Sequence, residues 1–168
     1  MLKIAVIGAG VSGLSVASLL AKAGYNITVF EKSEAISEIG AGVQISPNGF
    51  CVLKEMGVSE RALKKSICNN SIAICDYQKG KKLLQFEQRS SLGNKNFRLM
   101  HRADLVNVLL EAAESNKVSI KLGCSADASL LSDQYSIVIA ADGVHSKTRK
   151  FLNPSQRKNS DVGYFAWR

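Results

Sequence analysis

Histidines and paired cysteines, the usual ligands of metal sites, are scarce in this sequence. It contains two histidines, His101 and His145, and because neither has an evident partner we expect both to be exposed loop residues. The four cysteines form no C-x-x-C pair and no other metal-ligand spacing. We therefore predict free thiols, no metal site and a cytoplasmic location.

Acidic residues are also few, with 14 Asp and Glu against 22 Lys and Arg, for a net charge of +8. The basic residues are scattered, and no nucleic-acid-binding motif is present. Aromatic residues do not interleave with the densest basic clusters, which are Lys79, Lys81, Lys82 and Lys147, Arg149, Lys150. We expect a solvated surface or attraction of anionic cofactors, and no nucleic-acid partner.

The sequence lacks a run suited to crossing a membrane. Residues 4–21 are uncharged, but three glycines and three serines interrupt them, and no cleavage-site pattern is present. We therefore expect neither a signal peptide nor a membrane partner. With 46% hydrophobic residues in a chain of 168, the composition suits one globular domain with a core.

The opening segment, in contrast, carries a strong pattern. An apolar run over residues 4–7 meets Gly8-x-Gly10-x-x-Gly13, and a helix-like stretch extends to Gly24. A second apolar run over residues 27–30 ends on Glu31, which is followed by Lys32. This order of strand, glycine turn, helix and strand predicts a dinucleotide-binding βαβ unit.

Each part of this pattern has a separate role in holding a dinucleotide. Gly8 allows a tight turn, Gly10 lets the backbone approach a pyrophosphate, and Gly13 lets the helix pack closely on the strand. Val11 and Ser12 open a helix whose N-terminus directs N–H groups and a positive dipole end at phosphates.

Glu31 narrows the class of ligand. Its carboxylate lies roughly 20 residues beyond the glycines, where it can accept hydrogen bonds from ribose hydroxyls. The same charge would repel a 2′-phosphate. FAD or NAD therefore fits this pattern and NADP does not, with Lys32 as a further candidate cofactor-binding residue.

The middle of the chain interrupts the βαβ alternation. A helix capped by Ser46 and beginning at Pro47 is expected to bury its apolar side chains, Val52, Leu53 and Met56, and to stop at Gly57. Residues 71–77 and 81–88 read as two strands around Lys79-Gly80, a hairpin signal. These segments predict an antiparallel layer inserted at about residues 70–98.

The later part of the chain returns to the first pattern. A helix after Asp104 places Leu105, Leu109, Ala112 and Ala113 on one face, and short strands are expected at 118–122 and 136–140. The predicted fold is α/β, a Rossmann-like FAD-binding parallel sheet with an inserted antiparallel β layer, in one domain over residues 1–168. Because ligands collect at the carboxyl ends of parallel strands, the turn at Asp142-Gly143 is expected to lie beside the ligand.

Three separated motifs resemble the single-component FAD-dependent aromatic hydroxylases, the para-hydroxybenzoate hydroxylase superfamily, and especially their salicylate-hydroxylase-like branch. They are the glycine fingerprint with Glu31, the segment Glu38-Ile39-Gly40-Ala41-Gly42-Val43-Gln44-Ile45-Ser46-Pro47-Asn48-Gly49, and Ala141-Asp142-Gly143-Val144-His145-Ser146-Lys147-Thr148-Arg149. A supporting match is Met100-His101-Arg102-Ala103-Asp104-Leu105.

The resemblance implies roles for further residues. Arg102 would place a permanent cation near the diphosphate or ribityl chain of FAD; alone, it would read as a surface arginine paired with Asp104. Gly42 and Val43 would let the backbone approach the flavin end. Asp142 would take part in FAD and NADPH binding, and its carboxylate also suits a turn residue that binds nearby N–H groups.

The activity implied by the resemblance is monooxygenation of a small aromatic substrate with O₂ and with NADH or NADPH as reductant, the catalytic residues being unknown. Two alternatives stay open: a non-catalytic FAD- or nucleotide-binding remnant, and an NAD-dependent dehydrogenase. The resembled proteins are more than twice as long, and the strand-like run over residues 163–168 ends without a cap. We therefore expect a truncated amino-terminal part of a hydroxylase, incomplete in fold and not competent alone, whose carboxyl-terminal half is absent or separately encoded.

Overall fold

The computed structural model describes residues 2–36, 41–87 and 97–153. Contacts between residues divide the chain into two compact units, Met1–Glu38 with Leu109–Arg168, and Ile39–Val108. Each unit contains β-sheet of its own. The predicted motif residues Glu38, Ile39 and Gly40 and the run at 163–168 lie outside the described residues.

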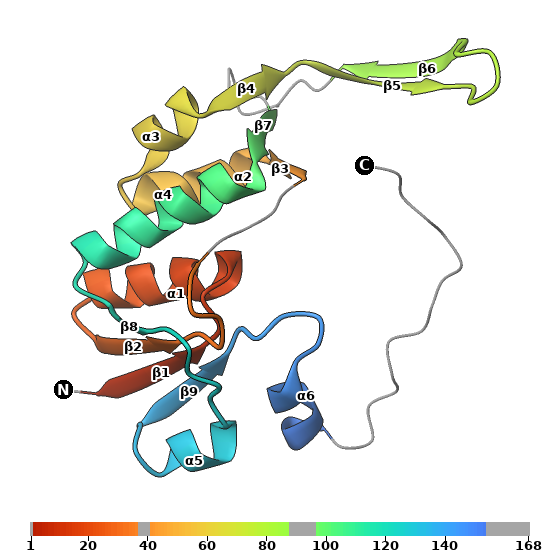
Figure 1. Cartoon of the computed structure of the whole chain (residues 1–168). Helices are drawn as coiled ribbons and strands as arrows, with labels where there is room; N and C mark the ends of the chain where they lie inside the picture. The colour runs from red at the N-terminus through yellow and green to blue at the C-terminus, as the bar shows by residue number, and fades with distance from the viewer. Residues whose placement is uncertain (1, 37–40, 88–96, 154–168) are drawn as a thin grey trace. The chain divides into compact units, whose positions relative to one another are not determined.

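A four-stranded parallel sheet organises the first unit (Figure 1). Its strands lie in the order β8-β2-β1-β9. Their bounds are β1 Lys3–Ile7, β2 Asn26–Phe30, β8 Ser119–Lys121 and β9 Ile137–Ala140. Ile4 of the central strand pairs with Ile27 on one side and Ile137 on the other. Because all four strands run the same way, their carboxyl ends meet at one edge of the sheet.

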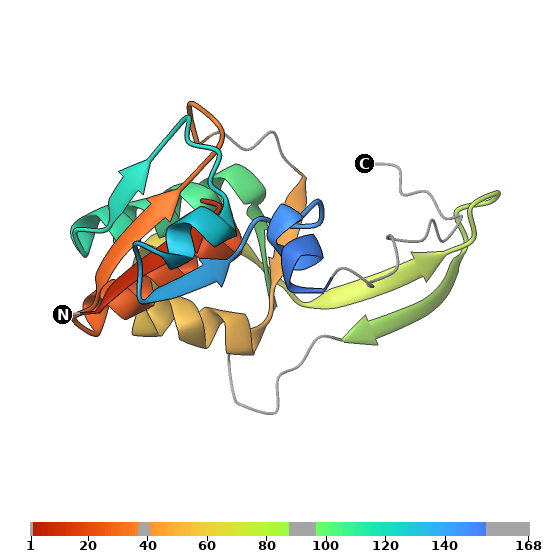
Figure 2. The ribbon, with the colours of Figure 1, turned by 90° about the horizontal axis from the view of Figure 1, so that it is seen from below.

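Helices cover both faces of this sheet. The α1 helix (Val11–Lys22) and the α5 helix (Ala128–Ser132) lie on opposite faces (Figures 1 and 2). Successive side chains of a strand point to opposite faces, and Ala5 and Ile7 of β1 pack with Leu131 of α5. Ile4 and Val6, at the alternate positions, are also buried, as is usual for a parallel sheet covered on both faces. A short helix, α6 (Lys147–Leu152), follows β9.

The second unit is built on antiparallel strands. One sheet has the order β3-β7-β4, formed by Gly42–Ile45, Phe97–His101 and Ser66–Asn69. A separate hairpin joins β5 (Ser71–Cys75) to β6 (Lys82–Glu87). The remaining elements are α2 (Pro47–Glu55), α3 (Ser59–Lys64) and α4 (Arg102–Ser115), the last of which continues into the first unit.

The predicted fold class is confirmed: the chain forms a parallel sheet with helices, and the antiparallel strands inserted in the sequence between β2 and β8 form sheets of their own. One core prediction is wrong, because Val52 is 42% exposed whereas Leu53 and Met56 are each 5% exposed. Successive helix residues are about 100° apart, so the buried face centred on Leu53 and Met56 leaves Val52 at its margin. The α4 helix also begins two residues before Asp104, at Arg102.

Candidate nucleotide-binding site

The glycine turn after β1 is sterically closed at two of its three glycines. Gly8 has a φ of +102°, and a Cβ there would lie 2.5 Å from the carbonyl oxygen of Ala141. A Cβ on Gly13 would overlap the carbonyl oxygen of Gly8. These two glycines are therefore required by the fold itself.

Gly10 differs, because a Cβ on it would meet no described atom within 4 Å. It is the N-cap residue of α1 and, having no side chain, it makes no side-chain cap hydrogen bond. The first turn of an α-helix has N–H groups without intrahelical partners. The N–H groups of Val11, Ser12 and Gly13 are thus placed, with the positive end of the helix dipole, where an anion can bind.

The Glu31 carboxylate is fixed beside this turn by the backbone. The N–H of Ala9 donates to Oε2 at 2.8 Å, and the N–H of Ser33 donates to Oε1 at 2.9 Å. Partial burial would raise the pKa of Glu31, but the hydrogen bonds from Ala9 and Ser33 outweigh it, so the pKa lies below its usual value. The Ser33 side chain also hydrogen-bonds to the carboxylate. Because a carboxylate has about four acceptor sites, Glu31 can still accept a hydrogen bond from a ligand.

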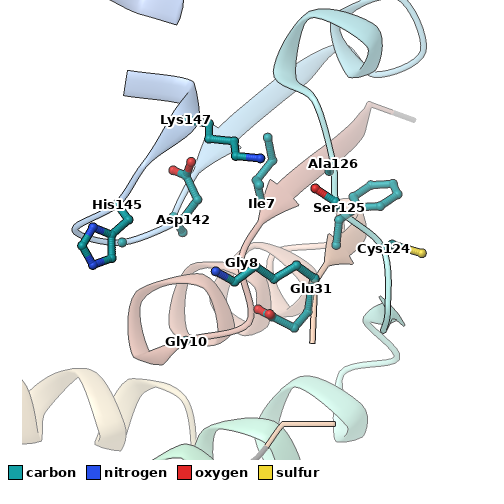
Figure 3. Close-up of a pocket in the computed structure, with 14 residues that line it drawn as sticks. Ile7, Gly8, Gly10, Glu31, Cys124, Ser125, Ala126, Asp142, His145 and Lys147 are labelled. Atoms are coloured by element: carbon teal, nitrogen blue, oxygen red, sulfur yellow. The ribbon is translucent and has the colours of Figure 1, made fainter. Parts of the chain in front are cut away.

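A pocket of about 250 Å³ opens at the carboxyl edge of the parallel sheet (Figure 3). Residues that follow all four strands line it: Gly8 and Gly10 after β1, Glu31 and Lys32 after β2, Cys124, Ser125 and Ala126 after β8, and Asp142, His145 and Lys147 after β9. Ile7 and Phe30, at the ends of their strands, add apolar wall. Apolar surface with a few polar groups is the usual composition of a ligand pocket.

Asp142 holds the loop that follows β9. Its Oδ1 accepts a hydrogen bond from the Ser146 hydroxyl at 2.7 Å, and its Oδ2 accepts from the N–H and the hydroxyl of Thr148 at 3.2 and 3.1 Å. Burial would raise the pKa of Asp142, but the hydrogen bonds from Ser146 and Thr148 outweigh it and lower the pKa. The carboxylate therefore has the turn-forming role expected from the sequence, and it also lines the pocket.

Arg149 also holds this loop through hydrogen bonds. The Ser146 hydroxyl accepts from the N–H of Arg149 at 2.9 Å, which caps α6, and the Arg149 guanidinium donates to the carbonyl oxygens of Gly143 and Val144 at 3.1 and 3.3 Å. The later positions of the Asp-Gly motif thus fix the backbone that carries the pocket-lining residues His145 and Lys147.

The remaining predicted site residues lie in the second unit. Gly42 pairs with His101 and Val43 with Met100 between β3 and β7, and Arg102 is the first residue of α4. The N–H of Arg102 donates to the carbonyl oxygen of Ala41 at 3.2 Å. The structure therefore brings Gly42, Val43 and Arg102 together. Asp104 forms an ion pair with Lys65 at 3.3 Å.

The sequence did not predict that Cys124, Ser125, Ala126, His145 and Lys147 line the pocket, and it misplaced His101. Cys124, Ser125 and Ala126 carry no motif, and their only signal is that they follow a predicted parallel strand. Lys147 was recognised as part of a basic cluster and of the Asp-Gly motif, but it was not predicted to line the pocket. His145 is exposed, as expected, but it lines the pocket, and His101 ends strand β7 instead of lying in a loop.

Comparison with known proteins decides the family. Residues 1–137 match the family described as an FAD binding domain. The chain belongs to this family. It is 32% identical over 164 residues to a 3-amino-4-hydroxybenzoate 2-monooxygenase of Streptomyces platensis, covering 89% of this chain and 41% of the relative. It is 29% identical over 184 residues to a 3-hydroxybenzoate 6-hydroxylase of Polaromonas naphthalenivorans, covering 98% and 46%.

A solved structure shows the same fold. The crystal structure of CtdE in complex with FAD and a substrate superposes with a TM-score of 0.74 at 22% identity, covering 90% of this chain and 40% of that one. The family match and the monooxygenase relatives confirm the resemblance to FAD-dependent aromatic hydroxylases. The chain spans less than half the length of these relatives. Among the described residues, no helix has the length and apolarity needed to cross a membrane.

Proposed function

We propose that this chain holds the adenosine diphosphate portion of FAD in an FAD-dependent aromatic monooxygenase. The observation that carries the proposal is the Glu31 carboxylate, fixed by the N–H groups of Ala9 and Ser33 at the edge of a pocket that also contains Gly8 and Gly10. Membership of the FAD binding domain family over residues 1–137 supports FAD as the dinucleotide.

The hydrogen-bonding groups at the pocket fit FAD. Ribose hydroxyls would donate to the free acceptor sites of Glu31, and the pyrophosphate would accept from the N–H groups of Val11, Ser12 and Gly13. The open space at Gly10 allows the backbone to approach the phosphates. Lys32 adds a cation to the pocket wall. A carboxylate at position 31 disfavours a 2′-phosphate, so NADP would not occupy this pocket.

Residues of the second unit would serve the other end of the cofactor. Gly42 and Val43 would allow backbone contact near the flavin, and the Arg102 guanidinium would neutralise phosphate charge or bind the ribityl chain. When bound, FAD would supply the redox chemistry, in which NADH or NADPH is oxidised, one atom of O₂ is transferred to a small aromatic substrate and the other is reduced to water. The parts of this chain that bind the cofactor would orient it and exclude water.

Asp142 would act on the cofactor mainly through the backbone. Its three hydrogen bonds to Ser146 and Thr148 fix the loop that carries Gly143, His145 and Lys147 along the pocket.

The chain spans 41% and 46% of the two monooxygenase relatives, which act as longer proteins on their aromatic substrates. A carboxyl-terminal half that completes the site for the substrate and O₂ is therefore part of the proposal.

Flavin binding tests the proposal. The purified chain should bind FAD, seen as a yellow colour and as quenched flavin fluorescence, and should not bind NAD with comparable affinity. Tighter binding of NAD than of FAD would favour the NAD-dependent dehydrogenase alternative. FAD binding without hydroxylation, even after a carboxyl-terminal half is supplied, would favour the non-catalytic remnant.

A further inference from the structure

In the second unit, two strands and a helix meet at one point. The register of β3 and β7 pairs Gly42 with His101, and the N–H of Arg102 donates to the carbonyl oxygen of Ala41 at 3.2 Å. Arg102 is also the first residue of α4. The position of the Arg102 backbone therefore depends on how the first turn of α4 is held.

The His101 ring holds that turn. Its Nδ1 accepts a hydrogen bond from the N–H of Ala103 at 3.3 Å. Ala103 lies in the first turn of α4, where an N–H group has no partner within the helix. Asn, Asp, Ser and Thr usually supply the capping acceptor. An imidazole can do so only while this nitrogen is unprotonated, so the ring must be neutral and carry its hydrogen on Nε2.

We propose that His101 is a positioning residue, whose neutral Nε2–H tautomer caps α4 and so holds Arg102 for the cofactor. Protonation of the ring then weakens FAD binding as the pH falls. This inference rests on the proposed function, in which Arg102 contacts FAD.

The surrounding charges disfavour the capped arrangement once the ring is protonated. A protonated ring would direct an N–H at the N–H of Ala103 and would add a positive charge at the positive end of the helix dipole, beside Arg102. Asp104, the nearest acid on α4, is already paired with Lys65 at 3.3 Å. On the neighbouring strands, the described titratable or charged side chains are Arg98 of β7 and Cys68 of β4, while β3 carries none.

The tautomer can be observed directly. Long-range ¹H–¹⁵N spectra of the ¹⁵N-labelled chain at pH 8 should show His101 as the Nε2–H form, with the Ala103 amide protected from hydrogen exchange. An Nδ1–H tautomer, or an unprotected Ala103 amide, would overturn the proposal. This measurement needs no cofactor, so its result is independent of whether the proposed function holds.

FAD affinity supplies the second test. Loss of a helix cap should weaken FAD binding by roughly threefold to tenfold. For the wild type we expect this loss on acidification from pH 7.5 to a pH at which the same ¹⁵N spectra show the His101 ring to be protonated. His101→Asn, an uncharged cap, should bind FAD as the wild type does at pH 7.5 and lose the pH dependence, whereas His101→Ala should bind more weakly at both values.

His145 lines the pocket of the first unit, so a control must separate its effect from that of His101. ADP, which is expected to need only the first unit, is the control ligand: any pH dependence that arises from His145 should appear with ADP and should be unchanged by His101→Asn. If His101→Asn keeps the wild-type ratio of FAD affinities at the two pH values, or if His101→Asn changes the ratio for ADP equally, the proposal is wrong. If the wild type binds no FAD at pH 7.5, the proposed function fails, and the tautomer and exchange measurements still decide the capping role.

Discussion

At the scale of single residues, Glu31 shows how a motif residue is prepared for its ligand. The N–H groups of Ala9 and Ser33 fix both carboxylate oxygens, so the side chain need not be ordered when a sugar binds. Because these hydrogen bonds lower its pKa, the group is ionised at neutral pH. Binding to a preorganised, charged acceptor costs less conformational entropy.

Replacing Glu31 by Gln should weaken binding of FAD and of ADP about 10- to 100-fold, the effect of losing hydrogen bonds to a charged group. The amide would also direct an NH₂ group at one of the two backbone donors. Isothermal titration calorimetry measures the affinity. Glu34→Gln, an exposed neighbour outside the pocket, is the matched control and should leave the affinity unchanged. Equal affinities for Glu31→Gln and wild type would contradict the assignment.

Two glycines of the turn should have different roles: Gly13 is needed for the fold, and Gly10 is needed for binding of FAD. Gly13→Ala should destabilise the chain by about 1–3 kcal/mol or more, because its Cβ would overlap the Gly8 carbonyl oxygen. Gly10→Ala should fold normally, since its φ is −78° and its Cβ would meet no described atom within 4 Å, but it should bind FAD poorly. Thermal unfolding and FAD titration measure the two effects. A stable Gly13→Ala, or full FAD affinity in Gly10→Ala, would count against this division.

At the scale of elements, the loop between β9 and α6 is held by one carboxylate. Asp142→Asn replaces one acceptor oxygen by a donor and should lower the free energy of unfolding by about 1–3 kcal/mol. Asp133→Asn, an exposed residue at the C-cap of α5, is the control and should change little. Urea unfolding compares the two variants, and an equal stability of Asp142→Asn and wild type would show that the loop does not depend on this group.

Because Asp142 holds this loop, the stability of the folded chain should depend on pH. The pKa of Asp142 in the folded chain is lowered from 3.8. A lowered pKa means that the carboxylate contributes its full stabilisation above the pKa of the unfolded chain and loses it as the pH falls through the lower, folded value. The stability lost between pH 5 and pH 2 should therefore be smaller in Asp142→Asn than in wild type. A parallel loss in both proteins would exclude Asp142 as the source.

Elements governed by local sequence were predictable, and those governed by pairing were less so. The first βαβ unit follows from periodicity and three glycines within 30 residues, so its strands and helix were predicted closely. The hairpin also has a local signal at Lys79-Gly80. The side of α2 that is buried depends on distant packing, and the exposure of Val52 could not be read from its own helix.

The candidate site likewise contains some residues that local sequence motifs predict and others that depend on how distant strands pair. Glu31 and Asp142 were found because fixed motifs contain them. Ser125 and Ala126 reach the pocket only because β8 lies next to β2 in the sheet, an order that no local pattern specifies. The capping of α4 by His101 depends on a ring orientation that composition and spacing do not encode.

At the scale of the whole molecule, the candidate cofactor residues divide between the two units. Gly8, Gly10, Glu31 and Asp142 line a pocket in the first, and Gly42, Val43 and Arg102 adjoin one another in the second. An adenosine phosphate should need only the first unit, whereas FAD should engage both. Arg102→Ala should therefore weaken FAD binding about tenfold and leave ADP binding unchanged, as comparison of the two titrations would show. Equal losses for both ligands would contradict the division.

The most direct test of the central claim is an ADP titration of the ¹⁵N-labelled chain, followed at each backbone amide. The account predicts saturable binding, with the largest shifts at the amides of residues 8–13 and 31–33, where the glycine turn and the Glu31 loop meet the pocket. No saturation at millimolar ADP, or shifts confined to other parts of the chain, would contradict it.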